Sequence, residues 1–184
     1  FSSPFALKGY LDSLEIDKEN IAYKKLYRYL NKFIENVTLE SINCKHILAD
    51  PDLITSRSMK LLDYIDQEVF DKKVVIFTSY TETASYLHEI LEKYFDCKIC
   101  GFYKNLPIKK LDSAINDFQQ KDEVKILICD YTAGEGRNLQ MADCIIHYDL
   151  PISPSEIEQR IGRLDRIGRD EQKVVLNVVV YSQD

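Results

Sequence analysis

The sequence predicts an α/β protein in which a mostly parallel sheet is covered by helices on both faces. From residue 56 onward, short β-rich runs alternate with helix-like segments of about ten residues or more, which is typical of right-handed βαβ crossovers. Residues 74–77 (VVIF) and 126–129 (ILIC) are continuous apolar runs, as expected for strands buried on both faces. Because ligands of such sheets gather at the carboxyl ends of the strands, we expect the site in the loops that follow them.

Two regions are predicted along the chain. Residues 1–55 read as a small helical segment, in which apolar residues recur at helical spacing over Ile21–Val37. We expect this helix to pack on a neighbouring domain, although its basic face is also suited to phosphate contact. Pro51 breaks the helical pattern near the boundary, and residues 56–184 form the α/β region.

The elements of the α/β region are predicted from periodicity and from β-branched content. The predicted strands are Val74–Thr78, Lys98–Phe102, Lys125–Cys129, Cys144–Tyr148 and Val174–Tyr181. The predicted helices between them are Met59–Phe70, Thr83–Tyr94, Lys109–Gln119 and Ser155–Arg166.

Composition limits the possible functions. The 184 residues are 45% hydrophobic and 29% charged, which suits one soluble domain with a sizeable core. The formal net charge of −6 means that nucleic-acid binding would need a local basic surface. No apolar run of about 18 residues and no signal peptide occur, so no membrane contact is expected. The sequence lacks an initiator Met, so we expect a piece of a longer chain.

The five cysteines are interpreted as buried free thiols in a reducing compartment, which predicts a cytoplasmic protein, or a nuclear one in a eukaryote. Cys97 and Cys100 form a CxxC pair, for which neither a metal site nor a redox role is predicted. A second ligand pair at metal-site spacing is missing, and strand-like flanks would point the two thiols to opposite faces.

The segment 153–169 carries the strongest functional signal. Ser153 is the expected N-cap of a helix, with Pro154 in its first turn and Glu156 completing a capping box. Gly162 inside the helix costs on the order of 1 kcal/mol relative to Ala. We therefore expect another group to approach the helix closely there.

Two stripes run along this helix. Its apolar residues Ile157, Ile161 and Leu164 fall at i, i+4 and i+7, which places them on one face. Arg160, Arg163 and Arg166 fall at i, i+3 and i+6 and form a basic ridge. The arginines of a surface helix often pair with neighbouring acids, but guanidinium groups after a parallel strand are also suited to bidentate phosphoryl contact.

Residues 159–169 (QRIGRLDRIGR) resemble motif VI of superfamily-two helicases, specifically the Swi/Snf and RapA-like branch. The resemblance implies that residues 56–184 are the second RecA-like domain of a motor. It further implies that Arg163 and Arg166 are catalytic arginine fingers on ATP, with Gln159 near the nucleotide. Arg160 is as well explained by a structural role.

Residues 130–142 (DYTAGEGRNLQMA) resemble motif V of the same family, the loop that couples ATP to nucleic acid. Gly134 and Gly136 permit a close backbone approach. The resemblance assigns these two glycines and Asn138 to the ATP site. Thr132 of the same loop is predicted to bind nucleic acid.

Residues 74–84 (VVIFTSYTETA) resemble motif IV. Thr78, Ser79 and Thr81 are predicted to hydrogen-bond sugar-phosphate oxygens. An alternative of equal weight is that Thr81 or Thr83 caps the next helix.

The sequence departs from the family pattern at two positions, Asp130 and Arg169. The family usually carries Ser or Thr where Asp130 stands, and a hydroxyl there would contact a backbone phosphate. A carboxylate would repel the phosphate, which counts against that contact. The family commonly has Gln where Arg169 stands.

The 184 residues contain no Gly-x-x-x-x-Gly-Lys-[Ser/Thr] segment, so they hold no P-loop for the β- and γ-phosphates. The resemblance therefore implies ATP with Mg bound mainly by a first RecA-like domain that is absent from this chain. The predicted function is the second motor domain of an ATP-dependent translocase or helicase on double-stranded DNA, inactive as an isolated piece. Two alternatives stay open, namely half of an RNA helicase and a non-catalytic scaffold that keeps the fold.

Overall fold

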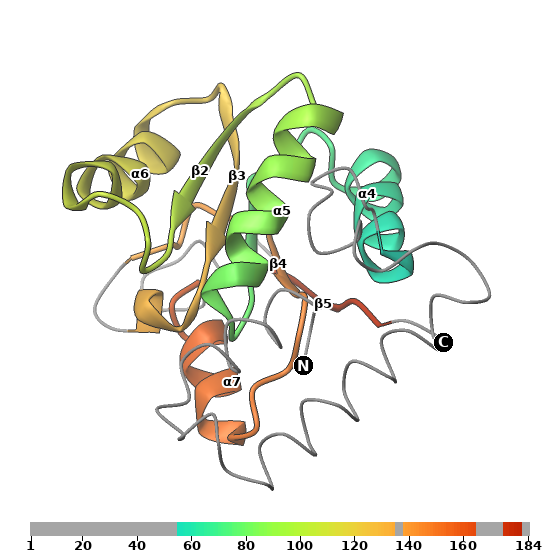
Figure 1. Ribbon diagram of the computed structural model, residues 1–184, viewed down its shortest axis with the longest axis vertical. Coiled ribbons are helices and arrows are strands. Elements are labelled where there is room, and N and C mark those ends of the chain that lie inside the picture. Colours follow the sequence, from blue (N-terminus) through green and yellow to red (C-terminus); the bar gives the residue numbers. More distant parts are fainter. Residues whose placement is uncertain (1–54, 135–137, 165–174, 182–184) are drawn as a thin grey trace, which may run out of the picture. The chain divides into compact units, whose positions relative to one another are not determined.

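The computed structural model describes residues 55–134, 138–164 and 175–181, which belong to one compact unit (Figure 1). The predicted helical segment over residues 1–55 lies outside the described residues except for Thr55. Gly136, Arg166 and Arg169 lie outside them as well.

Five parallel strands form one sheet in the order β2-β3-β1-β4-β5 (Figure 1). The strands are β1 (Val74–Phe77), β2 (Lys98–Phe102), β3 (Val124–Cys129), β4 (Cys144–His147) and β5 (Leu176–Val179). The helices are α4 (Ser56–Glu68), α5 (Thr81–Tyr94), α6 (Ile108–Gln120) and α7 (Pro154–Ile161), and a 3-10 turn, η1 (Tyr131–Gly134), follows β3. The predicted α/β fold with a parallel sheet is confirmed.

The central strand β1 explains why the apolar runs are continuous. It pairs with β3 on one side and with β4 on the other, and all four of its residues are buried. In this register Phe77 lies beside Cys129 and His147. The three strands therefore end at the same level, and the loops that begin at Thr78, Asp130 and Tyr148 lie side by side.

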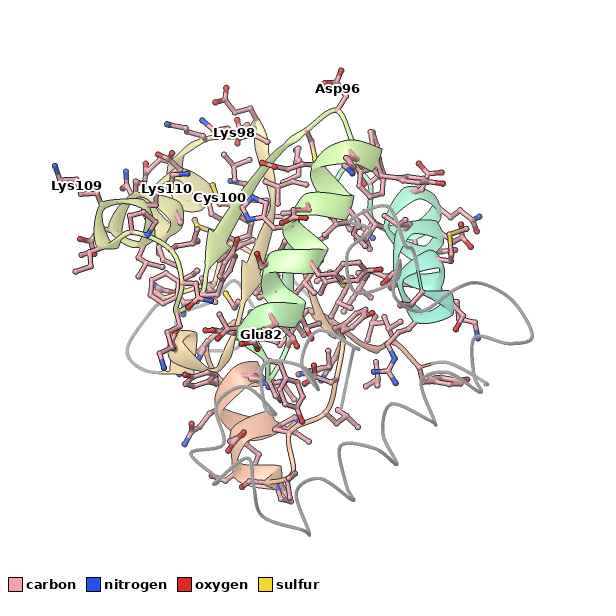
Figure 2. All side chains as sticks on the ribbon, viewed as in Figure 1. Glu82, Asp96, Lys98, Cys100, Lys109 and Lys110 are labelled. Carbon is pink, nitrogen blue, oxygen red and sulfur yellow. The ribbon has the colours of Figure 1, made fainter. Side chains whose placement is uncertain are left out.

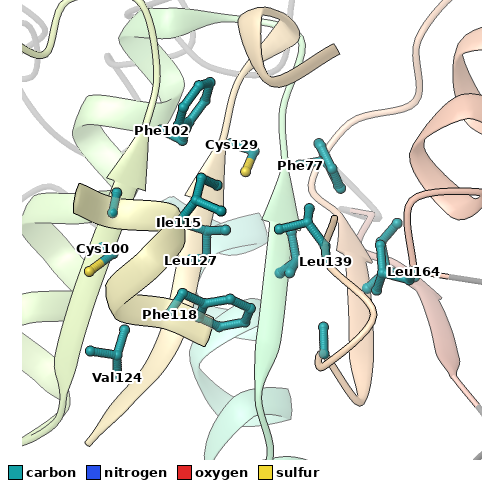
Figure 3. Packing of buried hydrophobic residues seen from close by; sticks show 14 residues of the cluster. Phe77, Cys100, Phe102, Ile115, Phe118, Val124, Leu127, Cys129, Leu139 and Leu164 are labelled. Atoms are coloured by element: carbon teal, nitrogen blue, oxygen red, sulfur yellow. The ribbon is translucent and has the colours of Figure 1, made fainter. Parts of the chain in front are cut away.

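Helices cover both faces of the sheet. On one face α6 packs on β2 and β3, and the segment around Leu139 and Leu164 covers the adjoining strands (Figure 3). On the other face α5 packs on β2 and β3, with α4 beside it (Figure 1). Burial raises the pKa of the Cys144 thiol to about 11. The alternate residues of β1 point to these two faces.

The helix ends correct several predictions. Tyr80, not Thr81 or Thr83, is the N-cap of α5, and α5 has no side-chain cap bond. Ser153 is the N-cap of α7 as predicted, but its hydroxyl makes no cap bond either, so the predicted capping box is not formed.

The helix α7 is shorter than predicted, because it ends at Ile161 with Gly162 as its C-cap. The nearest atom to a Cβ built on Gly162 would be the Glu158 carbonyl oxygen, 3.1 Å away on the helix itself. Gly162 therefore closes the helix in this structure. It does not mark a close approach by another segment among the described residues.

No helix of the described residues is long and apolar enough to cross a membrane. Within the same residues, no group of three or more His, Cys, Asp or Glu side chains is arranged to hold a metal ion.

Candidate nucleotide and nucleic-acid site

A pocket of about 270 Å³ opens at the carboxyl edge of the sheet, where the predicted ligand site was expected. It lies between the ends of β1 and β3 on one side and α7 on the other. Its lining residues are Phe77, Asp130, Tyr131, Glu156, Gln159, Arg160 and Arg163. Three residues of the segment that resembles motif VI therefore lie together in this lining, namely Gln159, Arg160 and Arg163.

Asp130 organises the loops on the β2 side of this edge. Its carboxylate is buried and accepts hydrogen bonds from the Thr81 hydroxyl at 2.6 Å and from the Lys104 amide at 3.1 Å. It also accepts from the Thr132 amide at 2.9 Å and from the Thr132 hydroxyl at 2.5 Å. One carboxylate therefore holds the start of α5, the loop after β2 and the turn η1.

Asp149 plays the same part on the β4 side. Its carboxylate accepts a hydrogen bond from the Thr78 hydroxyl, and from the Ser79 amide at 2.7 Å. The residue before it, Tyr148, is fully buried, and its hydroxyl lies 2.9 Å from the Ser58 hydroxyl of α4. The loop after β4 is thereby fixed both to the loop after β1 and to α4.

Arg160 reaches into this network from α7. Its Nη1 donates to the Asp149 carbonyl at 3.1 Å, and its Nη2 donates to the Ser79 hydroxyl at 3.1 Å. The guanidinium lies 5.4 Å from the centre of the Phe77 ring. Burial lowers the pKa of Arg160, and the neighbouring Asp149 opposes that change.

Arg163 lies just beyond the end of α7 and is also buried. Its Nε donates to the Gln159 carbonyl at 3.2 Å, so the helix itself orients this guanidinium. The Arg163 carbonyl accepts from the Leu139 amide at 3.2 Å, which ties the loop after η1 to the same turn. Gly134 ends η1.

Asn138 is exposed and does not line the pocket. Its side-chain oxygen accepts from the Gln140 amide at 3.0 Å, and its carbonyl accepts from the Gln119 side chain at 2.7 Å. In this conformation Asn138 therefore shapes its own loop, and its predicted place at the ATP site stays a prediction.

The four hydroxyls predicted to bind nucleic acid are all engaged inside the protein. Thr78 donates to Asp149, while Thr81 and Thr132 donate to Asp130. The Ser79 hydroxyl accepts from Arg160. A phosphate that accepted from Thr78, Thr81 or Thr132 would have to displace those bonds, so the direct role of these three hydroxyls is a prediction that this conformation does not favour. The Ser79 hydroxyl accepts from Arg160 and keeps its own hydrogen to donate.

Sequence reasoning missed Asp149 and the organising role of Asp130. The signal that could have found them is shared by both: each acid stands at or just after the end of a buried strand. A carboxylate at that place accepts from the amides and hydroxyls of the neighbouring loops. Tyr131 and Glu156 were missed as lining residues because the pocket exists only once α7 lies beside η1.

His147 is the last residue of β4 and is buried with no hydrogen-bond partner for either ring nitrogen among the described residues. Burial and then the nearby Arg160 lower the pKa of His147, while Asn177 and Asp149 act weakly in the opposite direction. The Asn177 side chain is close, but no hydrogen bond of good geometry joins it to the ring. His147 is therefore a buried imidazole near the Arg160 cation, and both the burial and the cation disfavour its protonated form.

Comparison with known proteins identifies the family of this chain. Residues 56–168 match the family described as the helicase conserved C-terminal domain. Because this match covers more than half of the chain, the protein belongs to that family. The relatives below include RapA proteins and a SWI2/SNF2 ATPase, and the predicted resemblance to the C-terminal domain of such helicases is confirmed.

The RNA polymerase-associated protein RapA of Pectobacterium atrosepticum is 37% identical over 117 residues, which are 63% of this chain and 12% of that protein. RapA of Erwinia tasmaniensis is 38% identical over 100 residues, which are 54% of this chain and 10% of that protein. The chain therefore spans only a small part of the length of these relatives.

Two solved structures support the RecA-like fold. The Sulfolobus solfataricus SWI2/SNF2 ATPase core in complex with double-stranded DNA has a TM-score of 0.56 at 26% identity, covering 68% of this chain and 26% of that chain. The C-terminal part of the Fun30 ATPase domain has a TM-score of 0.59 at 20% identity, covering 92% of this chain and 58% of that chain. The second likeness is one of fold alone.

Replacing Asp130 by Asn is expected to lower the free energy of unfolding by about 1–3 kcal/mol for each donor that loses its acceptor. The amide nitrogen of Asn would face an N–H or O–H donor where the carboxylate now accepts. Urea unfolding measures the change. Asp122→Asn is the control, because Asp122 is exposed, and equal unfolding of the two variants would contradict the assigned role.

Acid is expected to destabilise the protein through His147. The pKa of His147 is lowered in the folded state. Its contribution to the free energy of unfolding is therefore fully present above the unfolded pKa, near 6.5, and is lost as the pH falls through the lower folded pKa. Below pH 6.5 the unfolding free energy should fall by up to about 1.4 kcal/mol per pH unit from this one proton. The His147→Gln variant should lose that part of the slope, and identical slopes for both proteins would refute the assignment.

Proposed function

We propose that this chain is the second motor domain of an ATP-dependent nucleic-acid translocase or helicase that acts on double-stranded DNA. The observation that carries the proposal is Arg163, a buried arginine that lines a pocket at the carboxyl edge of a RecA-like sheet. In this proposal the chain supplies arginines to a nucleotide site that it does not complete alone.

The size of the pocket supports a shared site. About 270 Å³ is below the roughly 300–1,000 Å³ of pockets that enclose a whole ligand. A pocket of this size holds part of a nucleotide and leaves the rest to another surface. We propose that this surface is a first RecA-like domain, outside these 184 residues.

Two arginines and two acids, Asp130 and Glu156, line the pocket, so the support for a phosphate group comes from the chemistry of the arginines and not from net charge. Arg160 and Arg163 bring two guanidinium groups to its wall, and a guanidinium suits bidentate contact with phosphate. The facing carboxylate of Asp130 is occupied by donors from Thr81, Lys104 and Thr132. It therefore presents fewer free lone pairs to an anion than an unbonded carboxylate would.

Bound ATP would supply the phosphoryl group that is transferred to water. Arg163 would then face the γ-phosphate and stabilise the charge that develops on its oxygens. Arg166 is proposed as the second finger, with Gln159, Gly134, Gly136 and Asn138 around the nucleotide. Since the described residues include no acidic cluster for a metal, we propose that Mg is held mainly by the first domain.

Double-stranded DNA is proposed as the substrate because the Sulfolobus solfataricus relative, 26% identical, was solved with double-stranded DNA. The loop after β2 at the carboxyl edge offers exposed polar side chains, Lys104 and Asn105. Such groups can supply the local basic and polar surface that the net charge of −6 demands. This role would place the protein in the cytoplasm, or in the nucleus of a eukaryote.

Replacing Arg163 by Ala in the full-length protein is expected to lower nucleic-acid-stimulated ATP turnover by about 1,000-fold or more, as for other arginine fingers. Nucleotide binding should be partly retained, because the first domain would still hold ATP. Steady-state ATPase assays with duplex DNA and a fluorescent-nucleotide titration measure the two effects.

Lys98→Ala is the matched control for loss of one positive charge. Lys98 begins β2 at the opposite end of the sheet from Glu82, which lies at the start of α5 (Figure 2). ATP turnover by the Lys98→Ala variant should equal that of the natural protein. Unchanged turnover of the Arg163 variant would overturn the proposed function.

A further inference from the structure

We infer that Arg160 is a positioning residue, whose guanidinium braces α7 against the loop after β1 and so sets the place of Arg163. The inference rests on the proposed function, because it concerns the site to which Arg163 would contribute. It assigns to Arg160 a role distinct from that of an arginine finger.

The helix α7 is unusual because the side chain that it buries most is charged. Of the eight residues of this helix, Arg160 is the one whose side chain is buried. A short surface helix is normally held by an apolar stripe, but Ile157 and Ile161, predicted to form that stripe, are only half-buried. The apolar anchor Leu164 lies beyond the end of the helix and is fully buried. Ile161, the last residue of α7, packs against the hydrophobic core cluster, and Arg160 is the one buried side chain of the helix.

The bonds of Arg160 leave the helix and reach two other segments. Its Nη2 meets the Ser79 hydroxyl after β1, and its Nη1 meets the Asp149 carbonyl after β4. Asp149 in turn accepts from the Ser79 amide. The guanidinium therefore closes a ring of hydrogen bonds that joins α7, the β1 loop and the β4 loop.

Arg163 depends on the helix for its orientation. Its Nε donates to the Gln159 carbonyl of the preceding turn, and residues three or four positions apart lie on nearly the same side of a helix. A rotation or shift of α7 would therefore carry the Arg163 guanidinium with it. Ser79 follows the strand whose loop is the candidate contact for nucleic acid, so the same bond would connect that loop to the nucleotide site.

Arg160 also lines the pocket, and direct contact with phosphate is the competing role. Both of its terminal nitrogens already donate to protein oxygens at 3.1 Å. Burial lowers the pKa of Arg160, and its guanidinium contacts the Phe77 ring. Both observations indicate a side chain that is held in place. These two bonds use two of the five N–H groups of the guanidinium, so a direct ligand could keep them, and the affinity for ATP is needed to separate the two roles.

The test is a double-mutant cycle in the full-length protein, with Ser79→Ala, Arg160→Gln and both together. Ser79→Ala removes only the hydroxyl that accepts from Arg160. Each single change should lower kcat for duplex-stimulated ATP hydrolysis by about 10- to 100-fold, the rate equivalent of one hydrogen bond to a charged group. The double variant should be no slower than the slower single variant, since both changes break the same bond.

The affinity for ATP separates a brace from a ligand. Under the brace, the Kd of a fluorescent ATP analogue should change by less than about threefold in all three variants, because the effect of losing orientation falls on kcat. Ser113→Ala, an exposed serine on α6 that bonds only its own helix, should match the natural protein. Thermal midpoints exclude unfolding, and Arg160→Lys replaces Arg160→Gln if that variant does not fold.

Three results would overturn the inference: multiplicative losses in the double variant, a Kd that rises as much as kcat falls, or full activity of Ser79→Ala. These outcomes differ from failure of the proposed function, which the Arg163→Ala variant reports. If Arg163→Ala abolishes turnover while the Ser79 and Arg160 effects multiply, only the brace is wrong.

Discussion

Buried charge governs the carboxyl edge of this sheet. Asp130, Asp149, Arg160 and Arg163 are all less than a tenth exposed, and ionised groups are stable at such places only when hydrogen bonds replace the water they lose. Here the two carboxylates accept from the amides and hydroxyls of three loops, and Arg160 donates to two oxygens. The loops hold their shape because they supply these bonds.

This arrangement gives a physical reason for the departure at Asp130. Where the family usually carries a hydroxyl suited to a phosphate, this chain has an acceptor that draws Thr81, Lys104 and Thr132 inward. The loop after β3 then gains internal hydrogen bonds and loses the phosphate contact that a hydroxyl at position 130 would make. Exposed neighbours such as Lys104 remain available for the nucleic acid.

The sequence predicted the parallel sheet and its elements because buried strands and amphipathic helices leave periodic patterns. It also predicted the edge at which Arg163 and Gln159 meet. The order of the strands is not encoded in any local pattern, and the partners of Thr78 and Thr81 depend on that order. Asp149 could therefore not be paired with Thr78 in advance, since β4 lies beside β1 only in the folded sheet. Hydroxyls that were interpreted as ligand contacts are instead bonded to acids that the fold brings near.

The two arginines of the pocket illustrate how spacing alone misleads. Arg160 and Arg163 stand three residues apart with the same chemistry, yet the Arg160 guanidinium donates to Ser79 and Asp149, whereas the Nε of Arg163 donates to the Gln159 carbonyl. Arg160 is suited to hold α7 in place, and Arg163 is suited to act from the end of α7.

The most direct test of the central claim is a structure of the full-length protein with ADP, aluminium fluoride and duplex DNA. The account predicts the Arg163 guanidinium at about 2.7–3.1 Å from the fluoride that mimics the transferring phosphoryl group, with Arg160 still bonded to Ser79 and Asp149. A nucleotide contacted by other groups, with Arg163 turned away from the fluoride, would contradict it.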